Sequence, residues 1–215
     1  MYTTDSFVTL IDKVDANAVL RKIEYAARTC YQSYDKMTPD SAVELIRRAI
    51  ARGHESVLEH VQISFKVVCS RDVLAQWTRH RLASYSVESQ RYCNYTKDKY
   101  DFGVGFIMPM NVTYEMAEKI EEAYAAAETA YKELIAMGAK PEQARAVLPN
   151  GAKTEFVWSA NIREIRHFIA LRTSAGAQPD IKKLAQDVIE ILCALGLEVL
   201  IEDLIGESAT YEKSY

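Results

Sequence analysis

A run of charged and polar side chains from Arg79 to Arg91 limits what this chain can fold into more than any other feature. The run begins Arg79-His80-Arg81 and continues with hydroxyls, a carboxylate, an amide and a fourth cation, Arg91. A solvated helix face would space its charges about four residues apart and mix their signs. A buried element would have to pair or hydrate three adjacent cationic groups, because an isolated buried charge is costly. The run therefore predicts an anion-binding pocket in which arginine forks and serine hydroxyls hold phosphate oxygens.

The overall charge indicates that this pocket takes small anions. The 215-residue chain has a formal net charge of −4, with 26 Lys and Arg against 30 Asp and Glu. General nucleic-acid binders instead present a basic surface. We therefore expect no nucleic-acid partner, and a focused cationic site within an acidic protein.

Length, hydropathy and cysteine usage favour a cytoplasmic protein with a single domain over residues 1–215. A chain of this length can bury a substantial core, and no linker or repeat divides it. No apolar stretch is long enough to cross a membrane, and the first residues lack the features of a secretory signal. The four cysteines are scattered, without paired spacing or grouping with the four histidines, which favours reduced thiols and no metal site.

Hydrophobic periodicity predicts a helix-rich α/β (α+β) fold around a small mixed or antiparallel sheet. Short β-branched or alternating runs predict strands, while helical spacing with capping residues predicts helices. Strands are expected within 6–14 and at 61–68 and 154–159. Helices are expected at 15–30, 38–53, 72–79, 112–137, 141–146, 162–172 and 180–200, and a polar, tyrosine-rich loop at 91–100.

Further polar clusters need a chemical explanation. They lie at 54–60, at Glu142 with Arg145, and at 161–178. Arg145, Arg163 and Arg172 stand beside apolar residues in helices that look otherwise buried. A buried guanidinium needs an anionic partner, and only Glu142 and Glu164 are close in sequence. We expect Glu142 to orient Arg145, and a ligand phosphate or a substrate carbonyl to complete the pairing.

The order of these segments resembles the flavin-dependent thymidylate synthases. Arg79-His80-Arg81 followed by Ser84, Ser89 and Arg91 matches the signature of that family. Other matching segments, in family order, are Gly53-His54-Glu55 with Glu59-His60, Gln76-Trp77, Arg145 to Pro149, Asn161-Ile162-Arg163, and Leu171-Arg172 with Ala177-Gln178. The resemblance therefore covers most of the chain, and several ordered segments carry it together with the triplet.

The resemblance implies an activity and its cofactors. It implies methylation of dUMP to dTMP, with methylenetetrahydrofolate as carbon donor, FAD as prosthetic group and NADPH as reductant. It implies that no cysteine nucleophile is required. It also implies a homotetramer whose active sites lie at subunit interfaces and collect residues from more than one chain.

The same resemblance implies roles for individual residues. The expected dUMP contacts are Gln76, Arg79, Ser89, Gln90, Arg91, Arg145 and Arg172. The expected FAD contacts are His54, Ser56, Arg79, His80, Arg81, Asn161, Arg163 and His167. Arg172 is the expected catalytic residue, because a guanidinium facing uracil would favour ionisation at N3 and stabilise negative charge on the ring. Cation density of this kind suits phosphate groups.

Some positions depart from the family pattern. Many relatives carry Asn-Glu where this chain has Ser86-Val87, and the carboxylate of this chain stands at Glu88. His167 occupies a position often held by asparagine, and Cys30 one where serine is common. The sequence leaves the roles of these residues open.

Two blander interpretations stay open on the residues alone. The run at 79–91 could be a solvated basic loop or a structural salt-bridge hub. A diverged nucleotide-binding protein, for example an RNA-binding module, could keep the phosphate sites without the reaction, although the net charge and Arg172 count against it. Cys93 lies two residues past Arg91 in electropositive surroundings that favour a thiolate, yet the resemblance gives it no role.

Overall fold

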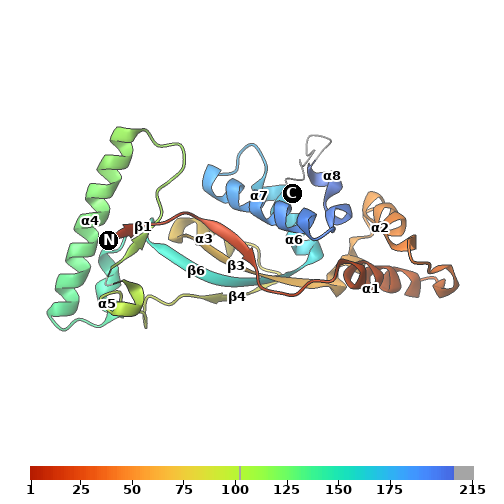
Figure 1. The fold of residues 1–215 in the computed structure, drawn as a ribbon, viewed down its shortest axis with the longest axis horizontal. Helices are drawn as coiled ribbons and strands as arrows, with labels where there is room; N and C mark the ends of the chain where they lie inside the picture. Colours follow the sequence, from red (N-terminus) through yellow and green to blue (C-terminus); the bar gives the residue numbers. More distant parts are fainter. Residues whose placement is uncertain (102, 206–215) are drawn as a thin grey trace.

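The chain folds around a four-stranded antiparallel sheet with the strand order β2-β3-β6-β4 (Figure 1). In this computed structural model, which describes residues 1–101 and 103–205, the strands are β2 (Phe7–Leu10), β3 (Gln62–Ser70), β4 (Ala83–Val87) and β6 (Lys153–Asn161). A short parallel pair, β1 (Tyr2–Thr3) with β5 (Gly105–Phe106), stands apart from this sheet. The expected helix-rich α/β fold with a small sheet is confirmed.

The helices form three groups, one along the sheet and one at each end of the molecule (Figure 1). They are α1 (Ala16–Thr29), α2 (Ser41–Ala51), α3 (Arg71–Trp77), α4 (Tyr114–Ala136), α5 (Pro141–Ala144), α6 (Ile162–Arg172), α7 (Pro179–Ala194) and α8 (Glu202–Ile205). Short 3₁₀ turns are η1 (Tyr34–Lys36), η2 (Glu55–His60), η3 (Asp98–Tyr100), η4 (Arg145–Val147) and η5 (Glu198–Leu200). Helices α3, α6 and α7 lie along the sheet, α1 and α2 at one end of the molecule, and α4 and α5 at the other.

Side-chain caps fix the starts of three predicted helices. Asp15 accepts from the backbone N–H of Ala18 at 3.2 Å, and Thr113 accepts from Met116 at 3.3 Å. Asn161 accepts from the backbone N–H of Glu164 at 2.9 Å. Each cap satisfies an N–H that the helix itself leaves unpaired, so these starts follow from local sequence.

Two elements differ from the sequence prediction. The C-terminal helix was expected to continue to about 200, but α7 ends at Ala194. Gly196 adopts a φ of +75°, and the N–H of Leu197 bonds to the carbonyl of Leu192 at 3.0 Å, which closes the helix with a left-handed cap. The strand β4 was not expected, because its hydrogen-bond partners lie in β6, about 75 residues further along the chain.

An aromatic cluster joins the elements that carry the candidate site. The Trp77 ring in α3 lies 4.3 Å from Phe168 in α6 and 5.3 Å from Trp158 in β6, between ring centroids. Trp158 and Phe168 are themselves 5.1 Å apart. All three side chains are fully buried. Since interiors are close-packed, this cluster fixes the end of α3 and the face of α6 relative to the sheet.

A second, smaller core lies under α4. Phe106 stacks on Tyr124 with centroids 4.3 Å apart, and Tyr131 is fully buried beside Tyr95. The apolar spacing of α4 predicts a buried stripe that includes Met116, Tyr124 and Tyr131, and the burial of Tyr124 and Tyr131 confirms it there. It is wrong at Met116, which is 57% exposed, because the first turns of α4 extend past this core. No helix in the described part of the chain is long and apolar enough to span a membrane.

Candidate active site

The strand β4 separates the polar run at 79–91 into two halves. Arg79, His80 and Arg81 precede the strand, and Ser89, Gln90 and Arg91 follow it. Five residues of extended chain span roughly 15 Å at about 3.3 Å per residue. A single chain therefore presents two cationic clusters at opposite ends of an edge strand.

His80 is the buried centre of the first half. Its side chain is 1% exposed, and its ring packs edge-on against Phe168 with centroids 5.1 Å apart. The Nδ1 atom lies 3.2 Å from a carboxylate oxygen of Glu164. The Nε2 atom lies 3.1 Å from Nε of Arg172. The imidazole thus bridges a buried carboxylate and a guanidinium.

The charge state of His80 determines which way its hydrogen bonds run. Burial lowers the pKa of His80 to about 4, with further lowering from the cationic Arg172 and from His167. The imidazole is therefore neutral near pH 7 and has one N–H. Arg172 can only donate, so Nε2 accepts and the N–H stands on Nδ1, where Glu164 accepts it.

Two bonds orient the Arg172 guanidinium at the end of α6. Besides the bond to His80, its Nη2 donates to the backbone carbonyl of Gln76 at 2.7 Å. Burial lowers the pKa of Arg172, and the nearby charge of Arg79 adds to the effect, although a guanidinium remains protonated. Two fixed contacts define the plane of the fork, and its remaining N–H groups can serve a ligand.

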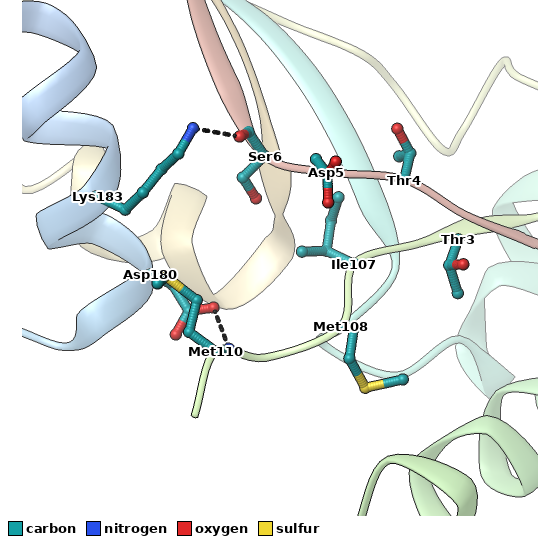
Figure 2. Close-up of a pocket in the computed structure, with 9 residues that line it drawn as sticks. All are labelled: Thr3, Thr4, Asp5, Ser6, Ile107, Met108, Met110, Asp180 and Lys183. Atoms are coloured by element: carbon teal, nitrogen blue, oxygen red, sulfur yellow. Dashed lines mark hydrogen bonds between the residues drawn. The ribbon is translucent and has the colours of Figure 1, made fainter. Parts of the chain in front are cut away.

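The side chain of Gln76 begins a chain of hydrogen bonds that leads to Asp180, which lines a hollow in the surface. Gln76 donates to Gln178 at 2.6 Å, and Gln178 donates to Asp180 at 3.1 Å and to Asp72 at 3.2 Å. Asp180 also accepts from the N–H of Met110 at 3.1 Å. Figure 2 shows Asp180, Met110 and Lys183 around this hollow of about 710 Å³, which none of the expected site residues line.

A hollow of about 570 Å³ lies beside the His80 network. Its lining residues are Glu55, Glu59, Leu82, Asn161, Arg163, Glu164, Arg166, His167, Ala170 and Leu204. Three of the expected FAD contacts, Asn161, Arg163 and His167, therefore share one surface with Glu164. Arg163 and His167 stand four residues apart on α6 and are both exposed, as helical spacing predicts.

The other expected FAD contacts surround this region without lining the hollow. His54 and Ser56 are exposed at the start of η2, a turn that packs on α6. Arg79 and Arg81 are exposed and form no ion pair among residues 1–101 and 103–205. Exposed guanidiniums without an acidic partner are a suitable donor set for a diphosphate. The residues at this end of the sheet thus fit a flavin dinucleotide by their chemistry.

The second half of the run lies at the far end of β4, near α5. Ser89 accepts from the backbone N–H of Arg91 at 3.3 Å, which shapes a turn that also contains the half-buried Gln90. Arg91 donates to Glu142 at 2.9 Å, and both are exposed. Arg145 is exposed at the end of α5. The expectation that Glu142 orients Arg145 is wrong, because the carboxylate contacts Arg91.

Glu88 has a clear local role. Its carboxylate accepts from the Tyr95 hydroxyl at 2.5 Å and from Lys153 at 3.1 Å. Burial raises the pKa of Tyr95, and the Glu88 charge adds to the shift, so the phenol stays protonated as a donor. These contacts fasten the end of β4 to the smaller core. In this chain Glu88 holds the loop that carries Ser89 and Arg91.

Comparison with known proteins shows the family. A profile described as "Thymidylate synthase complementing protein" matches residues 9–195. The chain belongs to the flavin-dependent thymidylate synthase family. It is 33% identical over 171 residues to the flavin-dependent thymidylate synthase of Pyrococcus furiosus, covering 78% of this chain and 69% of the relative. It is 35% identical over 179 residues to the enzyme of that name from Geobacter sulfurreducens, covering 79% and 75%.

A solved structure has the same fold as this family member. The crystal structure of a UMP/dUMP methylase from Streptomyces cacaoi, bound with 5-Br dUMP, superimposes with a TM-score of 0.77. The match covers 94% of this chain and 96% of the other at 24% sequence identity. At that identity the likeness concerns the fold.

This flavin-dependent thymidylate synthase family member has a buried arginine in α6, Arg166, that the sequence did not predict. Arg145 and Arg163 were expected in buried helices, but both are exposed, and Arg163 pairs with Glu59 at 2.6 Å. Arg166 is 5% exposed, and it contacts Asp203 at 2.7 Å and Glu55 at 3.1 Å. Its position one turn from the apolar Ile162 and Ile169 was a usable signal.

His80, Glu164 and His167 are residue types that bind metal ions, but a positive charge lies next to this cluster. Its ligand atoms lie within 4.8 Å of one another. Both ring nitrogens of His80 are already engaged, by Glu164 and by Arg172. A guanidinium at 3.1 Å from the imidazole would also repel a cation. The cluster is better described as a hydrogen-bond network.

Proposed function

We propose that this protein catalyses the reductive methylation of dUMP to dTMP. Methylenetetrahydrofolate would donate the carbon, with FAD as prosthetic group and NADPH as reductant. Relatives named flavin-dependent thymidylate synthases and a fold neighbour named as a dUMP methylase support this activity. The observation that carries the proposal is the Arg172 guanidinium, fixed by His80 and the Gln76 carbonyl with donors left over.

The nucleotide would be held by charge and oriented by Arg172. Arg79, Arg91 and Arg145 supply exposed guanidiniums for a phosphate monoester, and Gln76, Ser89 and Gln90 supply shorter polar contacts. A guanidinium next to the pyrimidine would stabilise negative charge at N3 as it develops. Because Arg172 is already oriented, little reorganisation would accompany that step.

The flavin would be held at the end of the sheet around His80. Arg79 and Arg81 are suited to its phosphates, and His54, Ser56, Asn161, Arg163 and His167 add polar contacts. His80 is buried beneath these side chains, so it would contribute to the flavin site from the protein interior. When bound, FAD would supply the reducing equivalents for the transferred methyl group.

A mechanism without a cysteine nucleophile agrees with the state of two of the four thiols, Cys69 and Cys193. Burial raises the pKa of Cys69 to about 12 and also raises the pKa of Cys193. Both therefore stay protonated near neutral pH, and the thiolate is the nucleophilic form. Cys93 is half-buried beside a hollow of about 700 Å³ along β4, and we assign it no covalent role.

We also propose that the working form is a cytoplasmic homotetramer of single-domain subunits. One chain holds Arg91 and Arg145 at one end of β4 and Arg79 and Arg172 at the other. A site that needs both groups would be completed by a neighbouring subunit, as symmetric oligomers allow. We expect no nucleic-acid or membrane partner.

Tritium release tests this activity. The purified protein is incubated with dUMP labelled at C5, with and without methylenetetrahydrofolate and NADPH. We expect release to water together with dTMP only in the complete mixture, and a flavin absorbance spectrum from the protein. A colourless protein that takes up no FAD, with no release, would overturn the proposal and favour a non-catalytic nucleotide binder.

A further inference from the structure

Glu164 is a buried carboxylate to which the sequence analysis assigned no function. It is 4% exposed and lies in the first turn of α6, where Asn161 caps the helix through the Glu164 N–H at 2.9 Å. One of its oxygens lies 3.2 Å from Nδ1 of His80 and 3.5 Å from Nδ1 of His167. A buried carboxylate is costly unless it is hydrogen-bonded, so its retention here calls for a role.

We propose that Glu164 is a positioning residue that acts through His80 to orient the guanidinium of Arg172. The chain of contacts runs from Glu164 to Nδ1 of His80 at 3.2 Å, and from Nε2 to Nε of Arg172 at 3.1 Å. The inference deepens the proposed function and rests on it for the kinetic tests. The hydrogen-bond arrangement can be tested without any turnover.

The physical reason lies in the two tautomers of a neutral imidazole. With the proton on Nδ1, Glu164 accepts it and Nε2 offers a lone pair to Arg172. With the proton on Nε2, an N–H would face the N–H of Arg172, and that bond would be lost. A carboxylate beside Nδ1 therefore selects the tautomer that holds the guanidinium. A carboxylate that accepts from the free ring nitrogen of a metal-binding histidine selects its tautomer in the same way.

The surrounding contacts leave His80 little freedom to satisfy Arg172 in another way. The Tyr85 hydroxyl donates to the His80 carbonyl at 2.7 Å, which holds the backbone. Phe168 packs against the ring edge-on. Because the ring is 1% exposed and packed against Phe168, the position of its proton is the variable that we consider. Glu164 is the acceptor that fixes it.

Three variants separate positioning from a general structural role. Glu164→Ala removes the acceptor, whereas Glu164→Gln keeps an amide oxygen that can accept from Nδ1. We expect kcat at saturating dUMP to fall about 10- to 100-fold in Glu164→Ala and to return to within about threefold of wild type in Glu164→Gln. Glu24→Ala is the matched control, because Glu24 is equally buried but pairs with Arg28 on α1. It should leave kcat per flavin-loaded protein unchanged.

A double-mutant cycle with Arg172 tests the route of the effect. If Glu164 acts through Arg172, Glu164→Ala should change kcat by less than about twofold in an Arg172→Ala background. The same 10- to 100-fold loss in both backgrounds would overturn the inference. Equal losses in the Ala and Gln variants of Glu164 would overturn it too, because charge and not hydrogen-bond acceptance would then matter.

Nitrogen-15 NMR of labelled histidines gives a readout that does not depend on activity. We expect His80, assigned by its absence in His80→Asn, to show a protonated Nδ1 and an unprotonated Nε2. The Nε2 resonance should shift in Arg172→Ala, and Glu164→Gln should keep the wild-type tautomer. A proton on Nε2 in the wild-type protein would overturn the inference, even if Glu164→Ala does not fold. A protein with the expected tautomer but no dUMP turnover would refute the proposed function and leave the Glu164 arrangement standing.

Discussion

Arg172 donates from its Nε to Nε2 of His80 across 3.1 Å, although the two residues are 92 positions apart in the chain. The bond requires a neutral imidazole, and burial together with nearby cations provides one. The guanidinium that we propose to face the pyrimidine is thus held by the buried member of the Arg79-His80-Arg81 triplet. In the triplet, His80 is therefore a buried structural residue, whereas Arg79 and Arg81 are exposed cations.

Removing Arg172 should abolish most dUMP turnover while the flavin stays bound. Arg172→Ala should lower kcat by about 10²- to 10³-fold, because it deletes a fixed charge directed at developing negative charge. Arg172→Lys keeps the charge but lacks the planar fork, and should recover only part of the loss. Turnover and flavin absorbance are measured on the same samples. Normal turnover in Arg172→Ala would remove this residue from the chemistry.

The stability of the protein should fall in acid partly because of His80. Burial lowers the pKa of His80 to about 4, whereas a histidine in the unfolded chain has a pKa near 6.5. Between these values the unfolded chain binds a proton that the folded chain does not. The free energy of unfolding should therefore decrease as pH falls from about 6.5 to about 4, by up to about 3 kcal/mol from this residue.

Denaturant unfolding across that pH range measures the effect of His80. In His80→Asn the slope between about pH 6.5 and about pH 4 should be shallower than in wild type. His60→Asn, which changes an exposed histidine outside the network, is the control. Identical slopes in wild type and His80→Asn would contradict the assignment.

Substituting Cys93 should leave activity largely intact. Cys93 lines the same hollow as Glu88 and stands two residues past Arg91, so it is the thiol nearest in sequence to the proposed dUMP contacts. The proposed mechanism needs no thiol nucleophile, and Cys93→Ala should retain kcat within about threefold. The assay is dTMP formation with saturating ligands. Complete loss of turnover with normal dUMP and FAD binding would mean that a cysteine takes part in the reaction.

Two inactive variants should complement each other if active sites are shared between subunits. Arg145 and Arg172 lie at opposite ends of β4 in one chain. If one site takes Arg145 and Arg172 from different subunits, mixed tetramers of Arg145→Ala and Arg172→Ala should regain activity in about a quarter of their sites. Activity is measured after subunit exchange, with light scattering to confirm the tetramer. No recovery in mixed tetramers would argue that each chain supplies both residues to the same site.

The helices that sequence predicted well are those whose ends have local causes. Asp15, Thr113 and Asn161 cap their helices through bonds to residues three positions away, so the signal lies within one turn. The early end of α7 also has a local cause, the positive φ of Gly196, but the expected helix continued past it to about 200. The polar segments that resemble the family were likewise found from the sequence, because side-chain types and their order are sufficient for a resemblance.

The sequence by itself determined the helix boundaries set by caps, the fold class and the family. The tertiary structure alone decided the pairing of His80 with Glu164 and Arg172, the separation of the two halves of the run by β4, and the burial of Arg166 in place of Arg163. The physical reason is that these features depend on contacts between residues far apart in the chain. Burial and pKa follow from which elements pack together, and a local pattern does not contain that information.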